Sequence, residues 1–168
     1  MSFAFSADEI FALAERIEKN GAEFYRRAAE TAACSGARHL LLDIARMEEG
    51  HQSAFSQMRK DLADKDRAAA TFDPENVTHQ YLASLAGSRV FTDPESPVPG
   101  ASDACAPDLL KRILEFAIGR EKDSIAFYTG MKELVATETG KCSIDDIIRE
   151  EMGHIRVLNN ELANLEQK

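Results

Sequence analysis

The chain is expected to fold as an all-α four-helix bundle made of two helical hairpins joined by a long crossover. Apolar residues recur at spacings of three and four along four separate stretches, which is the period of an amphipathic helix. All five prolines fall in the segment 65–107, so no continuous helix can cross it. A set of glutamates and histidines recurs at one fixed offset in both halves of the chain. Together these observations predict two related hairpins.

The first hairpin is predicted from a helix-start signal and two apolar stripes. Ser6 and Glu9 form a capping box that opens the first helix, and Cys34-Ser35-Gly36 ends it. The stripe of the first helix consists of Ile10, Leu13, Ile17, Gly21, Phe24 and Ala28. The stripe of the second consists of Leu40, Leu41, Ile44, Met47, Phe55, Met58 and Leu62.

The crossover is predicted to span residues 65–107 and to contain one short helix. That helix is expected from Thr78 to Ala86, with Tyr81, Leu82 and Leu85 on one face. If the third helix began at the end of the bundle where the second helix ends, a short turn would be enough to connect them. A link of more than forty residues can instead run the length of a helix of about 25 residues, which is roughly 38 Å.

The second hairpin begins with Pro107, a residue that suits the first position of a helix. Its first apolar stripe consists of Leu110, Ile113, Phe116, Ala117, Phe127, Met131 and Leu134. Thr139-Gly140 is expected to break this helix, and Ser143 to cap the last one, with acidic residues in its first turn. The stripe of the last helix consists of Ile144, Ile147, Ile148, Ile155, Leu158 and Leu162.

Six residues with metal-binding side chains recur with a period of 103 residues. The set consists of Glu18, Glu48 and His51 in the first half and Glu121, Glu151 and His154 in the second. In each half a lone glutamate is followed thirty residues later by Glu-x-x-His. An isolated Glu-x-x-His is common in sequences, whereas a duplicated set with equal gaps favours one shared site.

The helical period places these polar residues on apolar faces. Glu48 follows Ile44 by four residues, and Glu151 and His154 interrupt the last stripe in the same way. In each hairpin the two glutamates lie about fifteen residues, or roughly 22 Å, from the turn, which puts them at one height near the middle of the bundle. A Glu and a His three residues apart share a helix face, so both can reach one ion.

Four buried carboxylates require positive partners, because uncompensated buried charge is costly. No lysine lies on these stripes, and Arg120, beside Glu121, points about 100° away. Two divalent cations would balance the four charges, and iron, manganese and zinc accept both carboxylate and imidazole ligands. This ligand pattern is typical of two-metal sites in four-helix bundles. His39 and His79 are expected to be surface or structural residues.

Two further pairs of residues recur beside the predicted ligands. Tyr25 and Tyr128 each follow a predicted ligand glutamate by seven residues, and either donate hydrogen bonds to ligating carboxylates or are ordinary core tyrosines. Gly50 and Gly153 each precede a predicted ligand histidine. A mid-helix glycine costs about 1 kcal/mol relative to alanine, so its recurrence indicates either close approach of a neighbouring helix or common ancestry of the halves.

Composition narrows the class of protein further. A chain of 168 residues is expected to form a single domain, 1–168, and its net charge of −9 argues against nucleic acid or an anionic membrane as partner. The three cysteines, Cys34, Cys105 and Cys142, form no Cys-x-x-Cys and no disulfide framework, which favours a reducing compartment. There is no basic leader and no apolar run of membrane-spanning length. We therefore expect a cytoplasmic protein.

The six predicted ligands and the two Glu-x6-Tyr strings resemble the rubrerythrin branch of the ferritin-like superfamily, over both hairpins. The resemblance implies a ferritin-like bundle with a non-haem site for two iron ions, for which manganese or zinc could substitute. It implies that Glu48 and Glu151 bridge the ions, that Glu18 and Glu121 are terminal ligands, and that each histidine binds one ion. The implied activity is reduction of hydrogen peroxide or oxygen, with no catalytic residue beyond the metal ligands.

The chain departs from that family in two respects. It has no four-cysteine rubredoxin-like domain, so the resemblance implies a separate electron donor such as a rubredoxin. The family's additional glutamate, three residues after the ligand of the third helix, is replaced by Ser124. A ferroxidase or iron-storage protein and a non-catalytic metal-binding bundle remain alternatives. The sequence offers no fifth terminal helix of the kind many ferritins use in cage contacts, which favours the oxidoreductase over the iron-storage protein. We expect a homodimer.

Overall fold

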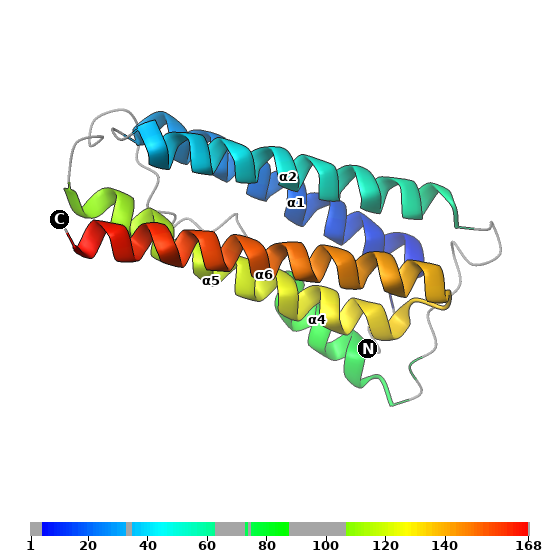
Figure 1. Cartoon of the computed structure of the whole chain (residues 1–168). Helices are drawn as coiled ribbons and strands as arrows, with labels where there is room; N and C mark the ends of the chain where they lie inside the picture. The colour runs from blue at the N-terminus through cyan, green and yellow to red at the C-terminus, as the bar shows by residue number, and fades with distance from the viewer. Residues whose placement is uncertain (1–4, 33–34, 63–72, 74, 88–106, 168) are drawn as a thin grey trace.

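Two helical hairpins form the body of the structure (Figure 1). In the first hairpin α1 (Ala7–Thr31) packs along α2 (Ser35–Lys60), and in the second α5 (Pro107–Leu134) packs along α6 (Glu138–Glu166). A short helix, α4 (Val77–Gly87), packs against α5. The end of α2 and the start of α5 lie at opposite ends of the bundle, so the chain returns along its length between the hairpins. The predicted all-α architecture of two hairpins and a crossover is confirmed.

The computed structural model describes residues 5–32, 35–62, 73, 75–87 and 107–167. Most of the predicted crossover 65–107, together with Cys34 and Cys105, lies outside these residues. Within the described part of the crossover, α4 confirms the short helix that was predicted from Thr78 to Ala86. None of the described helices has an apolar stretch long enough to cross a membrane. That the whole chain forms a single domain stays a prediction.

Two of the three helix starts predicted from residue-specific signals are confirmed, those at Ser6 and at Pro107. The Ser6 side chain accepts a hydrogen bond from the backbone N–H of Glu9 at 3.3 Å, and the Glu9 carboxylate accepts one from the backbone N–H of Ser6 at 2.9 Å. This reciprocal pair satisfies two amides that a helix start leaves without partners. Pro107 is the first residue of α5, where its missing N–H costs nothing.

The predicted boundaries of the two hairpin turns were wrong by a few residues. α5 already ends at Leu134, and α6 begins at Glu138 with Thr137 as its N-cap. The Thr137 hydroxyl accepts a hydrogen bond from the N–H of Gly140 at 3.2 Å, so the glycine lies in the first turn of a capped helix and does not break one. Ser143 lies inside α6, and Ser35-Gly36 begins α2 and does not end α1.

Two side chains that were assigned to apolar faces are exposed. Met47 is 40% exposed, because it lies on the side of α2 that faces an open groove towards α6. Tyr81 is 41% exposed although Leu82 beside it is fully buried. The Tyr81 ring covers Gly130 of α5, where an added Cβ would lie 2.9 Å from the ring. Glycine at position 130 therefore lets α4 pack closely against α5.

The core contains both copies of the Phe-Tyr string. Phe24, Tyr25, Phe127 and Tyr128 are fully buried, and the two rings of each string meet edge to face. Phe55 of α2 packs on Tyr128 with ring centroids 5.0 Å apart. The Phe55–Tyr128 contact joins α2 of the first hairpin to α5 of the second, in a tilted geometry at a centroid distance that aromatic pairs prefer.

Candidate metal centre

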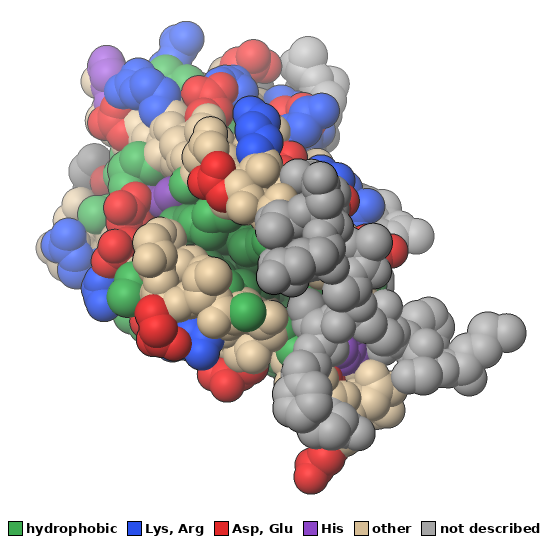
Figure 2. All heavy atoms as spheres, turned by 90° about the vertical axis from the view of Figure 1, so that its right-hand side faces the viewer, with side chains coloured by type: hydrophobic (Ala, Val, Ile, Leu, Met, Phe, Trp, Pro, Cys, Tyr) green, Lys and Arg blue, Asp and Glu red, His purple; other side chains and the backbone are tan. Residues whose placement is uncertain are grey.

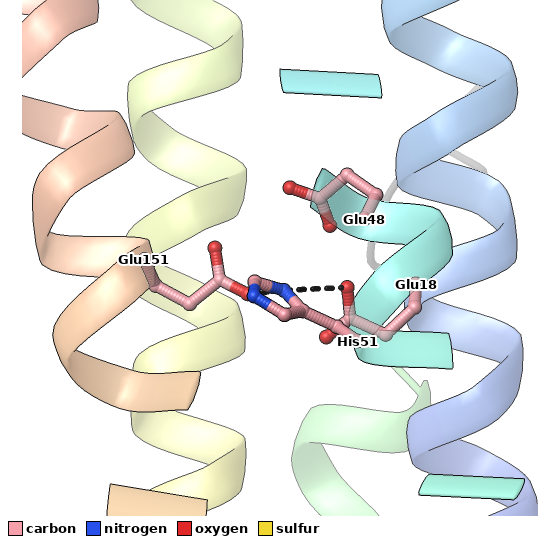
Figure 3. Close-up of side chains that lie close together, drawn as sticks. All are labelled: Glu18, Glu48, His51 and Glu151. Atoms are coloured by element: carbon pink, nitrogen blue, oxygen red, sulfur yellow. Dashed lines mark ion pairs between the residues drawn. The ribbon is translucent and has the colours of Figure 1, made fainter. Parts of the chain in front are cut away.

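The six predicted metal ligands meet in the interior of the bundle. Each long helix contributes at least one of them: Glu18 from α1, Glu48 and His51 from α2, Glu121 from α5, and Glu151 and His154 from α6. All six side chains are buried, with His51 the most exposed at 4%. Figure 3 shows four of them pointing towards one another from three helices. The predicted equal height of the glutamates is therefore confirmed.

The cluster divides into two sets of potential ligand atoms. The first set is formed by Glu18, Glu48, His51 and Glu151, and the second by Glu48, Glu121, Glu151 and His154. Within each set the ligand atoms all lie within 4.8 Å of one another. Glu48 and Glu151 belong to both sets, so their carboxylates lie where a bridging ligand between two ions must lie. The ligand roles themselves stay a prediction.

Both imidazoles present Nδ1 to the carboxylates. Nδ1 of His51 lies 3.0 Å from Glu151 and 3.5 Å from Glu18. Nδ1 of His154 lies 2.9 Å from Glu151 and 3.1 Å from Glu48. The two rings face each other with centroids 5.7 Å apart, so the centre has a pseudo-symmetric arrangement about the shared glutamates.

The outward nitrogens of the two histidines have different surroundings. Nε2 of His51 lies 2.8 Å from the carboxylate of Glu150 on α6, whereas Nε2 of His154 is buried with no hydrogen-bond partner among the described residues. A carboxylate on the outward nitrogen fixes the tautomer and orientation of a ligating imidazole. Sequence reasoning missed Glu150. The signal in the sequence was a difference between the two halves. Glu150 directly precedes Glu151, whereas the equivalent position in the first half is occupied by Met47.

The two recurring tyrosines donate hydrogen bonds to carboxylates of the cluster. Tyr25 of α1 donates to Glu121 of α5, and Tyr128 of α5 donates to Glu18 of α1. Of the two alternatives left open by the sequence, hydrogen bonding to the predicted ligands is therefore confirmed. Each tyrosine reaches the lone glutamate of the opposite hairpin. Burial, aided by the neighbouring carboxylates, raises the pKa of both phenols, which keeps them protonated as donors.

The charges of the cluster are strongly interdependent. Burial and repulsion from the neighbouring glutamates raise the pKa of Glu48. Burial alone would lower the pKa of the histidines, but the hydrogen bonds that they donate to the carboxylates outweigh it and raise the pKa of His51 to about 11 and of His154 to about 9. Burial also opposes the ionised form of Glu151, yet hydrogen bonds from His154 and His51 lower the pKa of Glu151. Protons therefore supply the positive charge when no cation does.

Several buried, inward-facing atoms find polar partners only within the cluster among the described residues. They are Nδ1 of His51 and four carboxylate oxygens, each within 3.7 Å of a histidine Nδ1: Oε2 of Glu18, Oε1 of Glu48, Oε2 of Glu121 and Oε1 of Glu151. Buried polar atoms in this state are costly unless a cation or water satisfies them. Four carboxylates and two imidazoles are an oxygen-rich, mixed donor set with a total charge that two divalent cations balance. The cluster fits a di-metal site.

The other residues weighed from the sequence lie outside this cluster. His39 is exposed, and its Nδ1 lies 2.7 Å from the Ser35 carbonyl. His79 is buried, with Nδ1 2.9 Å from the carboxylate of Asp73, which makes it a structural residue as predicted. Cys142 is exposed on α6. Ser124, one turn after Glu121, is buried with its hydroxyl unpaired among the described side chains.

The proposed explanation of the recurring glycines by close helix approach was wrong. A Cβ atom added to Gly50 or to Gly153 would meet nothing within 4 Å. There is therefore free space beside Gly50, which precedes His51, and beside Gly153, which precedes His154. Common ancestry of the two halves is the alternative that remains.

The comparisons with known proteins support the fold. No protein-family model matches this chain, and no curated protein matches it. A solved structure described as a candidate ferritin-like diiron-carboxylate protein from Thermotoga maritima is similar, with a TM-score of 0.67 and 21% sequence identity. The similarity covers 97% of this chain and 98% of that one. At this identity the likeness shows the fold alone, so the chain has a ferritin-like four-helix bundle fold.

Proposed function

We propose that the protein is a non-haem di-iron oxidoreductase that reduces hydrogen peroxide or oxygen. The observation that carries the proposal is that Glu48 and Glu151 are shared by two four-residue sets of ligand atoms in a buried cluster. The description of the similar Thermotoga structure as a diiron-carboxylate protein supports iron as the metal. When bound, the iron ions supply the redox chemistry of the reaction.

The residues of the chain hold and orient the ions. Glu18 and His51 would bind one ion, Glu121 and His154 the other, and the shared glutamates both. Tyr128 and Tyr25 hold the terminal carboxylates of Glu18 and Glu121 in place, since each phenol donates to one of their oxygens. The near-complete burial of the six residues excludes bulk water, which strengthens every electrostatic interaction in the site.

The rubrerythrin-like variant of this reaction belongs to the same proposal. Ser124 stands where that family carries an additional glutamate, and its buried hydroxyl is a smaller, neutral hydrogen-bonding group. Electrons would come from a separate donor such as a rubredoxin, because the sequence contains no Cys-x-x-Cys. We further propose a cytoplasmic homodimer as the working form.

The test is anaerobic reconstitution with ferrous iron followed by oxidation. We expect about two ions per chain from the paired ligand sets, and faster appearance of ferric absorption with one equivalent of hydrogen peroxide than with oxygen. Steady-state turnover should require an added rubredoxin and its reductase. Faster oxidation by oxygen together with a 24-subunit particle in size-exclusion chromatography would indicate an iron-storage protein. Bound iron that does not change oxidation state with either oxidant would indicate a metal-binding bundle without turnover.

A further inference from the structure

A cavity of about 1220 Å³ lies between α2 and α6 and opens at the end of the bundle that carries the α5–α6 turn. Figure 2 looks onto this end and shows hydrophobic side chains gathered in a hollow. Ile10 and Phe11 of α1, Met58 of α2, Leu134 of α5 and Ile147 of α6 are among the residues that line it. The groove exists because α2 and α6 touch at few points, whereas each packs closely along its own hairpin partner.

The inner part of this cavity reaches one side of the metal centre. His51 lines it, together with Gly50 and Glu150, and the other five clustered residues do not. A molecule in the cavity would therefore contact the Glu150 carboxylate that holds Nε2 of His51. The cavity is adjacent to the first set of potential ligands, and His51 is the one member of the cluster that borders it.

The size and lining of the cavity indicate an organic ligand. Pockets for small organic molecules have volumes of roughly 300 to 1000 Å³ and mostly apolar walls, whereas peroxide and oxygen need far less space. Apolar side chains from four different helices form the wall, and flexible Met47 and Met58 are among them. An elongated apolar molecule matches a groove that runs between two helices.

The charged residues that line the cavity favour a positively charged ligand. Asp61, Glu133, Asp146 and Glu150 line it, and Lys141 is the one lysine or arginine among the described residues that do so. Asp146 is paired with Arg149, Glu150 with His51 and Lys141 with Glu138. Asp61 and Glu133 have no ion-pair partner among the described residues, so an uncompensated charge of −2 remains at the cavity. This excess attracts organic cations and repels carboxylates and phosphates.

We propose that the groove between α2 and α6 is a binding site for an elongated apolar amine, with the chain on the apolar wall and the ammonium group towards the carboxylates. This site goes beyond the proposed oxidoreductase reaction and does not depend on it, because none of its apolar wall belongs to the metal centre.

The test uses the full chain and a neutral fluorescent probe, N-phenyl-1-naphthylamine. We expect saturable binding of one probe per chain and displacement by decylamine at a concentration at least tenfold lower than by decanoate, each below its micelle concentration. Binding without saturation, or equal displacement by the amine and the carboxylate, overturns the proposal.

The two recurring glycines provide a matched pair of variants. Gly50 lines the cavity and Gly153 does not, and an added Cβ meets nothing within 4 Å at either position. Gly50→Phe should place a ring in the cavity and weaken probe binding at least tenfold, while Gly153→Phe leaves it unchanged. Equal loss in both variants contradicts the site. If circular dichroism shows that Gly50→Phe does not fold, the double variant Asp61→Asn/Glu133→Gln provides the test. Removing these two carboxylates should reduce the preference for decylamine over decanoate. An unchanged preference overturns the proposal.

Discussion

The two halves of the metal centre have the same ligands but different surroundings. In the first half, Nε2 of His51 is held by Glu150 at 2.8 Å, and the ring borders an open cavity. In the second half, Nε2 of His154 is buried without a partner among the described residues. The two halves therefore have the same side chains facing the centre of the cluster, but the groups around the outward nitrogen of each histidine differ. Since the groups behind a ligand tune its basicity and orientation, the two ions should differ in affinity.

The largest effect is expected from removing a shared carboxylate. Glu151→Ala takes one ligand from both four-residue sets, so the metal content should fall from about two ions per chain to below one. His39→Ala is the matched control, because that exposed histidine lies outside the cluster. Elemental analysis of folded protein measures both. Equal metal contents in the two variants would show that Glu151 is not a shared ligand.

The asymmetry between the halves is tested by Glu150→Gln. Loss of the carboxylate behind His51 should weaken one of two binding steps about 10- to 100-fold and leave the other unchanged. Glu49→Gln is the control, because Glu49 is paired with Arg26 on the surface. A titration followed by cobalt absorption resolves the steps. If both steps weakened equally, the two halves would be equivalent and our comparison wrong.

Without metal, the cluster should make the folded protein less stable as the pH rises. The pKa of His51 is raised from 6.5 to about 11 and that of His154 to about 9, so their stabilising contribution is complete below pH about 6.5 and is lost as pH rises through those values. The raised pKa of Glu48 and Glu121 acts in the same direction above pH about 4.5.

The free energy of unfolding of the metal-free protein should therefore fall between pH 6 and pH 10. Zinc competes with these protons for the same atoms, so the rise in Tm on adding zinc should be larger at pH 8 than at pH 6. Thermal melts with and without zinc check both parts. A metal-free Tm that climbs over this range would rule out the charge arrangement described here.

The smallest effects concern the two tyrosines. Tyr25→Phe and Tyr128→Phe each remove one buried hydrogen bond to Glu121 or Glu18, which should cost about 1 to 3 kcal/mol in the metal-loaded protein. Denaturant unfolding measures the loss. Because the two bonds are related by the repeat, the two values should agree closely, and a large difference would show that the halves also differ in how their terminal glutamates are held.

The sequence predicted the six clustered residues because the repeat fixes their positions and the helical period fixes their faces. It could not predict that the tyrosines reach across to the opposite hairpin, or that Glu150 meets His51, since both contacts depend on how the hairpins pack. Met47 was placed on a buried face because the open groove between α2 and α6 leaves no trace in a helical period. The start of α6 was missed because Thr137 and Ser143 are both good N-caps, and local sequence does not decide between them.

The central claim is that one buried cluster binds two ions through two shared glutamates. Its most direct test is a titration of the metal-free protein with cobalt or ferrous iron under anaerobic conditions, with the stoichiometry fixed by elemental analysis. Our account predicts two ions per chain, bound in two steps of unequal affinity, and a fall to below one ion per chain in Glu151→Ala. Folded protein that binds one ion or none would contradict it.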